Sequence, residues 1–328
     1  MRQKFQIFFL TLTLEEGVYW WKLEKEITMK INMIRSDKVY HELLELPLEK
    51  REGCFRAKIL APFATKYQTQ HIPLKAKYPG GFDALFLLGF MNQLPSTLSE
   101  KDRPAIDALS SDQLWQNCQD TIKRSIGLFE QAGYDLEVED YYFTILLGNP
   151  EKPMLQLNKG YSGDGGIPGY LMLSLLPNDY TLPRVQAALA HECNHNVRFQ
   201  FIKWNQQTTL ADWVVSEGLA ESFAAELYGK DLIGPWVTST SSEQLEEIKP
   251  IISSQLQLTG MAEMAPYLYG DEIAEIQGQI PVGMPYAAGY AYGYHLIQAY
   301  LKKTGKSIIE ATVTPTEEIL EATKDFWK

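Results

Sequence analysis

The sequence has few cysteines, no surplus of basic residues and no long apolar run. Only three cysteines occur among 328 residues, and Cys54, Cys118 and Cys193 are too few and too widely spaced for a disulfide framework. We therefore expect a reducing, cytoplasmic location. The 41 acidic side chains outnumber the 30 basic ones and give a formal charge of −11, a sign that repels the phosphates of nucleic acids and anionic lipids. We expect no nucleic-acid or membrane partner.

The N-terminus carries a short segment with some features of a signal peptide. Two basic residues precede an apolar run at residues 5–14, and two glutamates follow it without a small-residue cleavage site. The run is shorter than the roughly 20 apolar residues that a membrane-spanning helix needs. We therefore favour the cytoplasm over export, and we interpret residues 1–32 as an extension that precedes the compact part of the chain.

The rest of the chain has the composition of a globular protein, with 45% hydrophobic and 22% charged residues. Apolar residues recur three or four positions apart in segments of residues 33–136, which predicts a mainly helical N-terminal part. An apolar run at residues 82–91 predicts a buried segment within it. Residues 241–328 are again helical in pattern and are expected to close a cleft. Between these parts, residues 137–240 form the expected metal-binding catalytic core.

The hydrophobic period changes at the start of this core. Residues 141–147 are rich in aromatic and β-favouring types and end at a Gly-Asn-Pro turn, which predicts a strand. Residues 154–157 and 170–176 are interpreted as two more strands. The glycine-rich residues 160–166 between them are interpreted as a loop, and they lack the GxxxxGK[ST] signature of a phosphate site. The predicted fold is therefore α+β with a small mixed sheet.

The main chemical signal is HECNH at residues 191–195, inside a helix expected at residues 185–201. His191 and His195 are four apart, so both imidazoles lie on one helical face and can reach one metal ion. Glu192 lies about 100° around the helix, where its carboxylate can act as a general base without binding the metal. Zinc is the natural candidate because it accepts imidazole and carboxylate donors and lowers the pKa of bound water to about 7.

The next expected helix supplies a carboxylate in the segment SEGLAE, residues 216–221. Glu217 follows His195 by enough residues for the chain to reverse and return to the metal. Glu221, one turn further on, can accept the free ring N–H of a ligand histidine. Either glutamate can be the ligand, and we favour Glu217. The alternative is a solvated acidic face. Gly218 argues against it, because glycine within a helix costs about 1 kcal/mol relative to alanine and indicates a close approach of another backbone.

At these residues the sequence resembles the gluzincin metallopeptidases, in which HExxH on one helix is joined by a glutamate from the following helix. HECNH, SEGLAE and the later AAGYAYGYHLIQAYLKKTGKS resemble, more narrowly, the YjaZ-like family of predicted zinc-dependent proteases. The resemblance implies His191, His195 and Glu217 as zinc ligands and Glu192 as the catalytic acid/base. It also implies a gluzincin-like fold in which the HExxH helix packs against an antiparallel glutamate helix.

Gluzincins commonly supply a downstream tyrosine or histidine that donates a hydrogen bond to the oxyanion of the transition state. Tyr286, Tyr290 and Tyr294 recur every four residues, and His295 is adjacent. Tyr290 is the first candidate for this catalytic role and His295 the second. An aromatic stripe at helical spacing is more often part of a core, so packing remains the alternative. Arg198, on the metal helix, is expected to be a structural ion-pair partner.

The strand expected at residues 170–176 directly precedes the metal helix. Its edge can pair with an extended peptide by β-addition, or it is simply an edge strand. Together these features predict a zinc-dependent metallopeptidase that hydrolyses peptide bonds in peptide or protein substrates, with Glu192 as general base. One alternative is a zinc hydrolase of non-peptide substrates. The other is a non-catalytic peptide-binding protein on a peptidase fold.

Overall fold

The computed structural model of the chain describes residues 29–327. The signal-like run at residues 5–14 and most of the expected extension lie outside these residues. Within the described part, no helix combines the length and the apolar character needed to cross a membrane.

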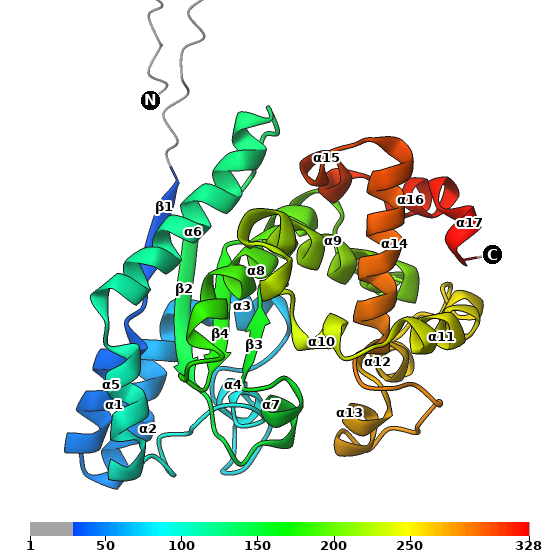
Figure 1. Ribbon diagram of the computed structural model, residues 1–328. Coiled ribbons are helices and arrows are strands. Elements are labelled where there is room, and N and C mark those ends of the chain that lie inside the picture. The colour runs from blue at the N-terminus through cyan, green and yellow to red at the C-terminus, as the bar shows by residue number, and fades with distance from the viewer. Residues whose placement is uncertain (1–28, 328) are drawn as a thin grey trace, which may run out of the picture.

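A four-stranded mixed sheet lies at the centre of the sheet-containing half (Figure 1). The strand order across the sheet is β1 (Lys30–Met33), β2 (Asp140–Leu147), β4 (Tyr170–Leu175) and β3 (Tyr161–Asp164). The first three strands in this order are parallel, and β3 runs antiparallel to β4. Strand β1 pairs with β2 from Lys30 onward. Residues 30–32, which were assigned to the extension from the sequence, therefore belong to the sheet.

Two of the three expected strands are confirmed, as β2 and β4. The strand expected at residues 154–157 is wrong, because this segment is helix α7 (Pro153–Leu157). A proline at the first helical position pre-sets the helical φ angle, and a segment of four residues is too short to show a period that separates strand from helix. The third strand is instead β3, which forms inside the segment 160–166 that was interpreted as a loop.

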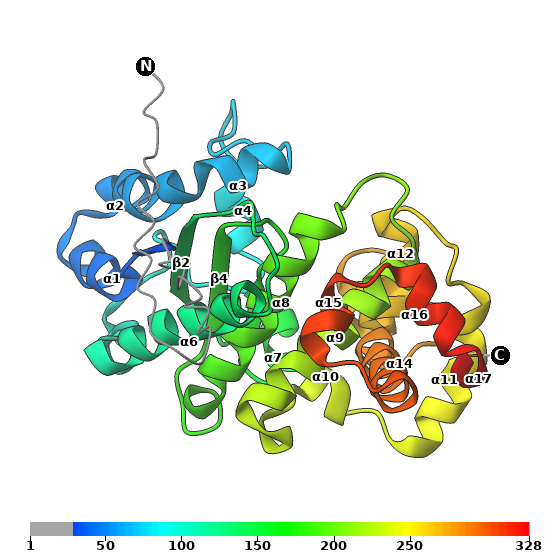
Figure 2. The same ribbon diagram turned by 90° about the horizontal axis from the view of Figure 1, so that it is seen from above.

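Helices cover both faces of the sheet. Figure 2 shows α2 and α3 on one face, and α6 and α8 on the other. Trp115 of α6 contacts the ring of Phe143 on β2, with ring centroids 5.8 Å apart, so apolar burial joins the long helix to the sheet. The helices of this N-terminal part are α1 (Ser36–Glu45), α2 (Leu48–Phe55), α3 (Ala64–Thr69), α4 (Ala84–Leu88), α5 (Arg103–Leu109) and α6 (Asp112–Gln131).

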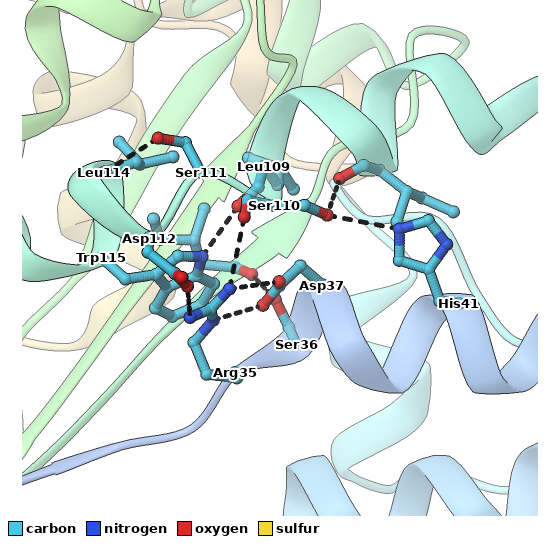
Figure 3. Close-up of polar contacts among 12 residues, drawn as sticks. Arg35, Ser36, Asp37, His41, Leu109, Ser110, Ser111, Asp112, Leu114 and Trp115 are labelled. Carbon is cyan, nitrogen blue, oxygen red and sulfur yellow. Dashed lines mark hydrogen bonds and ion pairs between the residues drawn. The ribbon is translucent and has the colours of Figure 1, made fainter.

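A polar cluster fixes the junction between β1 and α1 (Figure 3). Arg35 donates to both carboxylate oxygens of the buried Asp37, at 2.8 and 2.7 Å, and also pairs with Asp112 in the first turn of α6. The guanidinium lies 5.2 Å from the ring centre of Trp115. These contacts connect the start of α1 to the start of α6, two segments more than 70 residues apart in the chain.

The apolar run at residues 82–91 is not the buried segment that was expected. Three of its aromatic side chains are substantially exposed, Phe82 at 54%, Phe86 at 47% and Phe90 at 42%. They contact one another instead, with centroids of successive rings 5.9 and 5.4 Å apart. The short helix α4 buries Ala84, so only one side of it faces the core.

The remaining helices continue from the sheet toward the C-terminus. Helix α8 (Val185–Phe201) lies against the sheet, and α9 (Leu210–Tyr228) packs between α8 and α14 (Ala288–Thr304). Helix α9 begins with a capping box of Thr209 and Asp212 and is followed by Gly229, whose φ is +96°. The other C-terminal helices gather beyond α9, away from β1 (Figure 1): α10 (Pro235–Thr238), α11 (Ser242–Ser254), α12 (Met261–Tyr269), α13 (Asp271–Ile276), α15 (Ile308–Val313), α16 (Thr316–Ala322) and α17 (Lys324–Trp327).

Candidate metal centre

The two histidines of HECNH lie on one face of α8, as their spacing predicts. Their Nε2 atoms are 3.1 Å apart, and each lies 3.2 Å from Oε2 of Glu217 on α9. His191 is 4% exposed, His195 6% and Glu217 7%. Two helices therefore bring two imidazole nitrogens and one carboxylate oxygen together in the protein interior.

The second glutamate of SEGLAE occupies a different position. Oε2 of Glu221 lies 2.8 Å from Nδ1 of His191, the ring nitrogen opposite the one that faces Glu217. An acceptor there holds the proton on Nδ1 and leaves the Nε2 lone pair free for a metal. Glu217 is therefore the glutamate that lies with both histidine Nε2 atoms in a group that could hold a metal ion, and Glu221 lies behind His191.

The donor set fits zinc. Tetrahedral bonds of about 2.0–2.1 Å to nitrogen and oxygen place the donor atoms about 3.3–3.4 Å apart, close to the spacings found here. Two histidines and a glutamate are also a donor set used by catalytic zinc sites, which keep a fourth position open. Nδ1 of His195 has no hydrogen-bond partner among residues 29–327. The ring of His195 is held instead by stacking on Phe199, at 5.6 Å and 6° between planes.

The charge state of Glu217 suits a side chain that binds a metal cation. Burial would raise the pKa of this carboxyl, but the neighbouring imidazoles of His195 and His191 outweigh it and lower the pKa to about 2. Glu217 is therefore ionised throughout the neutral range, as a metal ligand must be.

Glu192 is buried beside the cluster and lies against the hairpin that begins with β3. A Cβ atom on Gly163 would lie 2.0 Å from its Oε1, and one on Gly165 would lie 2.4 Å from its backbone oxygen. Glycine at both positions therefore makes room for the glutamate. Burial raises the pKa of Glu192, and the charges of Glu217 and Asp164 raise it further, against the opposing effect of the two imidazoles. A raised pKa suits a proton acceptor in general-base catalysis.

The two candidate oxyanion donors differ in their surroundings. Burial raises the pKa of Tyr290 well above its usual value, and the charges of Glu217 and Glu192 add to the effect, so its hydroxyl remains a donor near the cluster. Burial lowers the pKa of His295, whose charged neighbour is Lys249 of α11. His295 lies five positions after Tyr290 in α14, so it faces a different side of the helix, toward Lys249 and not toward the cluster.

Arg198 is not the ion-pair partner that was expected. Its guanidinium is fully buried and donates to the carbonyl oxygens of Thr312 and Thr314 and to the hydroxyls of Ser216 and Thr316. Desolvation lowers its pKa to about 10. Arg198 thus joins the metal helix to the segment that connects α15 and α16.

The strand expected at residues 170–176 does not lie at the edge of the sheet. Strand β4, at residues 170–175, lies between β2 and β3 and has neighbours on both sides. The edge strands of the described sheet are β1 and β3, and Gly163 of β3 pairs with Leu173 of β4. The edge strand β3 therefore passes directly beside Glu192.

Two tryptophans that contact the site were not singled out from the sequence. Trp213 donates its indole N–H to Oε1 of Glu217 at 3.3 Å, and Trp236 donates to Oε2 of Glu221 at 2.7 Å. Trp213 precedes Glu217 by four residues on one helix, a spacing that could have signalled the contact. Trp236 belongs to another helix, so residue spacing carried no such signal.

The fold and this cluster define a class: an α+β protein with a buried His–His–Glu donor set suited to a divalent cation. Comparison with known sequences then identifies the family. The chain belongs to the family described as predicted Zn-dependent protease (DUF2268), whose profile matches residues 114–321. The resemblance to YjaZ-like predicted zinc proteases is thereby confirmed.

Two relatives from Bacillus subtilis (strain 168) are similar to the chain. It is 34% identical to the uncharacterized protein YjfC over 293 residues, which cover 89% of this chain and 97% of YjfC. It is 26% identical to the uncharacterized protein YjaZ over 155 residues, 46% of this chain and 55% of YjaZ. No solved structure matches the chain significantly.

Proposed function

We propose that the chain is a cytoplasmic, gluzincin-type zinc metallopeptidase that hydrolyses peptide bonds in peptide or protein substrates. One observation carries the proposal: the donor atoms of His191, His195 and Glu217 lie 3.1–3.2 Å apart in the protein interior, with a buried glutamate beside them. Membership of a family of predicted zinc-dependent proteases supports it.

The protein's own groups account for the proton transfers of such a reaction. When bound, zinc supplies a Lewis acid and lowers the pKa of a bound water from 15.7 to about 7. Glu192 accepts the proton of the attacking water and later delivers it to the leaving amine. Tyr290 keeps its proton and donates a hydrogen bond to the oxygen on which negative charge develops.

Strand β3 offers a place for an extended substrate. A peptide that pairs with a sheet edge gains main-chain hydrogen bonds while its alternate side chains enter pockets. A peptide on the edge of β3 lies next to Glu192, because Gly163 of this strand touches that carboxylate. In this proposal, the edge of β3 therefore holds the scissile peptide bond beside the Glu192 carboxylate.

A pair of substitutions tests the proposal. Glu192→Gln should retain zinc and lose turnover by about 10²–10⁴-fold, the usual contribution of a general acid/base. His195→Ala should lose the metal itself, because it removes one of three ligands. Elemental analysis of the purified proteins and cleavage of a mixed peptide library measure the two effects. A Glu192→Gln protein that cleaves peptides at the parental rate contradicts the role of Glu192.

The same assay separates the proposed activity from the two alternatives. Chelator-sensitive cleavage of peptides supports a peptidase. Chelator-sensitive cleavage of esters or small amides, with peptides untouched, identifies a zinc hydrolase of other substrates. Peptide binding without any chelator-sensitive cleavage identifies a binding protein on a peptidase fold.

A further inference from the structure

Each of the two glutamates that contact His191 also accepts an indole N–H. Trp213 and Glu217 are joined at 3.3 Å, and Trp236 and Glu221 at 2.7 Å. The arrangement occurs twice, with tryptophans from two different helices.

The hydrogen bond from Trp213 gives the two oxygens of Glu217 different partners. Oε1 accepts the indole N–H, while Oε2 faces both histidine Nε2 atoms. The terminal torsion of a glutamate is soft, so an uncommitted carboxylate can rotate and present either oxygen. The indole bond favours one rotation. The tryptophan is itself held, because Trp204 and Tyr269 contact its ring edge-on at 5.4 and 5.5 Å.

Glu221 is held from the start of α10. Its Oε1 accepts the backbone N–H of Gly234 at 2.6 Å, and its Oε2 accepts from both Trp236 and Nδ1 of His191. A Cβ atom on Gly234 would lie 2.1 Å from the Trp236 ring, so glycine lets the loop and the indole approach Glu221 together. The ring of Trp236 also meets that of His191 at 5.8 Å. The α10 segment therefore fixes the acceptor that orients the histidine.

The chemistry of indole suits this task better than that of other donors. Indole N–H is a donor only and carries no charge. A lysine or arginine in its place would add a positive charge that repels a divalent cation at the same carboxylate, and a histidine could bind the metal itself. An indole orients the carboxylate, leaves its charge available and excludes water with its apolar body.

We infer that Trp213 and Trp236 are positioning residues that set the zinc affinity of the site, Trp213 through Glu217 and Trp236 through Glu221 and His191. The inference rests on the proposed zinc site. Loss of such outer contacts typically weakens metal binding about 10- to 100-fold.

Phenylalanine substitutions remove the N–H and keep an aromatic ring. Trp213→Phe and Trp236→Phe should each weaken zinc binding about 10- to 100-fold, measured by competition between metal-free protein and a chromophoric chelator. Trp327→Phe is the matched control, because it also removes an indole N–H, which donates to the backbone oxygen of Leu320 at 2.9 Å and not to either glutamate. It should remain within about twofold of the parent. Thermal unfolding of the metal-free proteins separates lost affinity from lost folding.

A double-mutant measurement tests whether Trp236 acts on the zinc site through Glu221. If Trp236 acts through Glu221, zinc affinity of the Trp236→Phe, Glu221→Ala double variant should equal that of Glu221→Ala alone within about twofold. If the losses of zinc affinity in the two single variants add in the double variant, Trp236 does not act through Glu221. If a variant fails to fold, ¹⁵N-indole spectra of the parent protein decide. Zinc should shift the N–H signals of Trp213 and Trp236 and leave that of Trp327, which donates to Leu320, in place. The reverse pattern overturns the inference.

The inference and the proposed function fail differently. A parent protein that binds no zinc overturns the proposed function, and the inference with it. A parent that binds zinc, with Trp213→Phe and Trp236→Phe both at parental affinity, overturns the inference alone.

Discussion

Three glutamates in and beside the cluster have different surroundings. Glu217 faces two imidazoles, which lower its pKa despite burial, so it stays ionised, as its proposed role as a metal ligand requires. Burial raises the pKa of Glu192, which suits its proposed role as general base. Glu221 has partners on both oxygens, including the Nδ1 of His191, as its proposed orienting role requires. All three side chains are less than 10% exposed, so these local contacts distinguish them.

A single buried carboxylate outside the site gives a prediction on stability. Asp83 accepts from the backbone N–H groups of Phe86 and Ala76 at 2.9 and 3.0 Å and from Arg56 at 2.8 Å. Asp83→Asn should lower the free energy of unfolding at pH 7 by about 1.5–3 kcal/mol, the value of hydrogen bonds to a charged group. The exposed Glu52 pairs with the same arginine, and Glu52→Gln should cost less than about 1 kcal/mol. Urea denaturation measures both.

The pH dependence of this difference has a definite sign. Burial opposes ionisation of Asp83, but the two backbone N–H groups and Arg56 lower its pKa below the usual value. A lowered folded-state pKa stabilises the fold above the unfolded pKa of about 3.9 and loses that contribution as the pH falls toward the folded value. The stability gap between the parent and Asp83→Asn should therefore be constant from pH 7 to about 5 and shrink below pH 4. A gap that widens in acid contradicts the assignment.

Among the elements, α9 depends most on close backbone contact. A Cβ atom on Gly218 would lie 2.1 Å from the backbone oxygen of Gly293 on α14, and one on Gly293 would lie 2.0 Å from that of Val214. The close approach that Gly218 indicated in the sequence is thus confirmed. Its partner was not predicted, because nothing within α9 specifies which of the later helices covers it.

Alanine at this position should separate the two helices. Gly218→Ala should lower the free energy of unfolding by about 1–3 kcal/mol, because the overpacking exceeds the gain in helix propensity. Gly53 is the matched control: it lies in α2, and a Cβ there would meet nothing within 4 Å. Gly53→Ala should stabilise the protein by up to about 1 kcal/mol. Equal effects of the two substitutions in thermal or urea unfolding would show that the α9–α14 contact contributes nothing.

The cluster lies between the two halves of the molecule. Helix α8 belongs with the sheet, whereas α9 and α14 belong with the C-terminal helices (Figure 1). Besides the contacts of α8, two further contacts between these halves are described here. The hydroxyl of Tyr286 donates to Asn158 at 2.7 Å, and the ring of Tyr161 on β3 contacts Trp236 with centroids 5.1 Å apart. The more than 90% burial of His191, His195 and Glu217 depends on how these halves meet.

Removal of the crossing hydrogen bond should ease access to the metal. Tyr286→Phe should raise the rate of zinc removal by a competing chelator about fivefold, the effect of losing a bond of about 1 kcal/mol. Tyr292→Phe is the control, because this hydroxyl bonds to Ser253 within the C-terminal helices, at 3.1 Å. It should leave the rate unchanged. Equal rates for both variants and the parent, followed in a stopped-flow spectrometer, contradict a closing role for Tyr286.

Local spacing was sufficient for the features that one helix or strand defines. The shared face of His191 and His195 and the offset of Glu192 follow from helix geometry. A run of aromatic and β-favouring residues before a turn was sufficient to predict β2. Residue spacing within one element could not predict contacts between segments that are distant in the chain. Three features depend on how separate elements pack: which glutamate faces the Nε2 atoms of both histidines, the edge position of β3, and the indole bonds. Packing is set by the burial and fit of the whole chain, and no short stretch of sequence contains it.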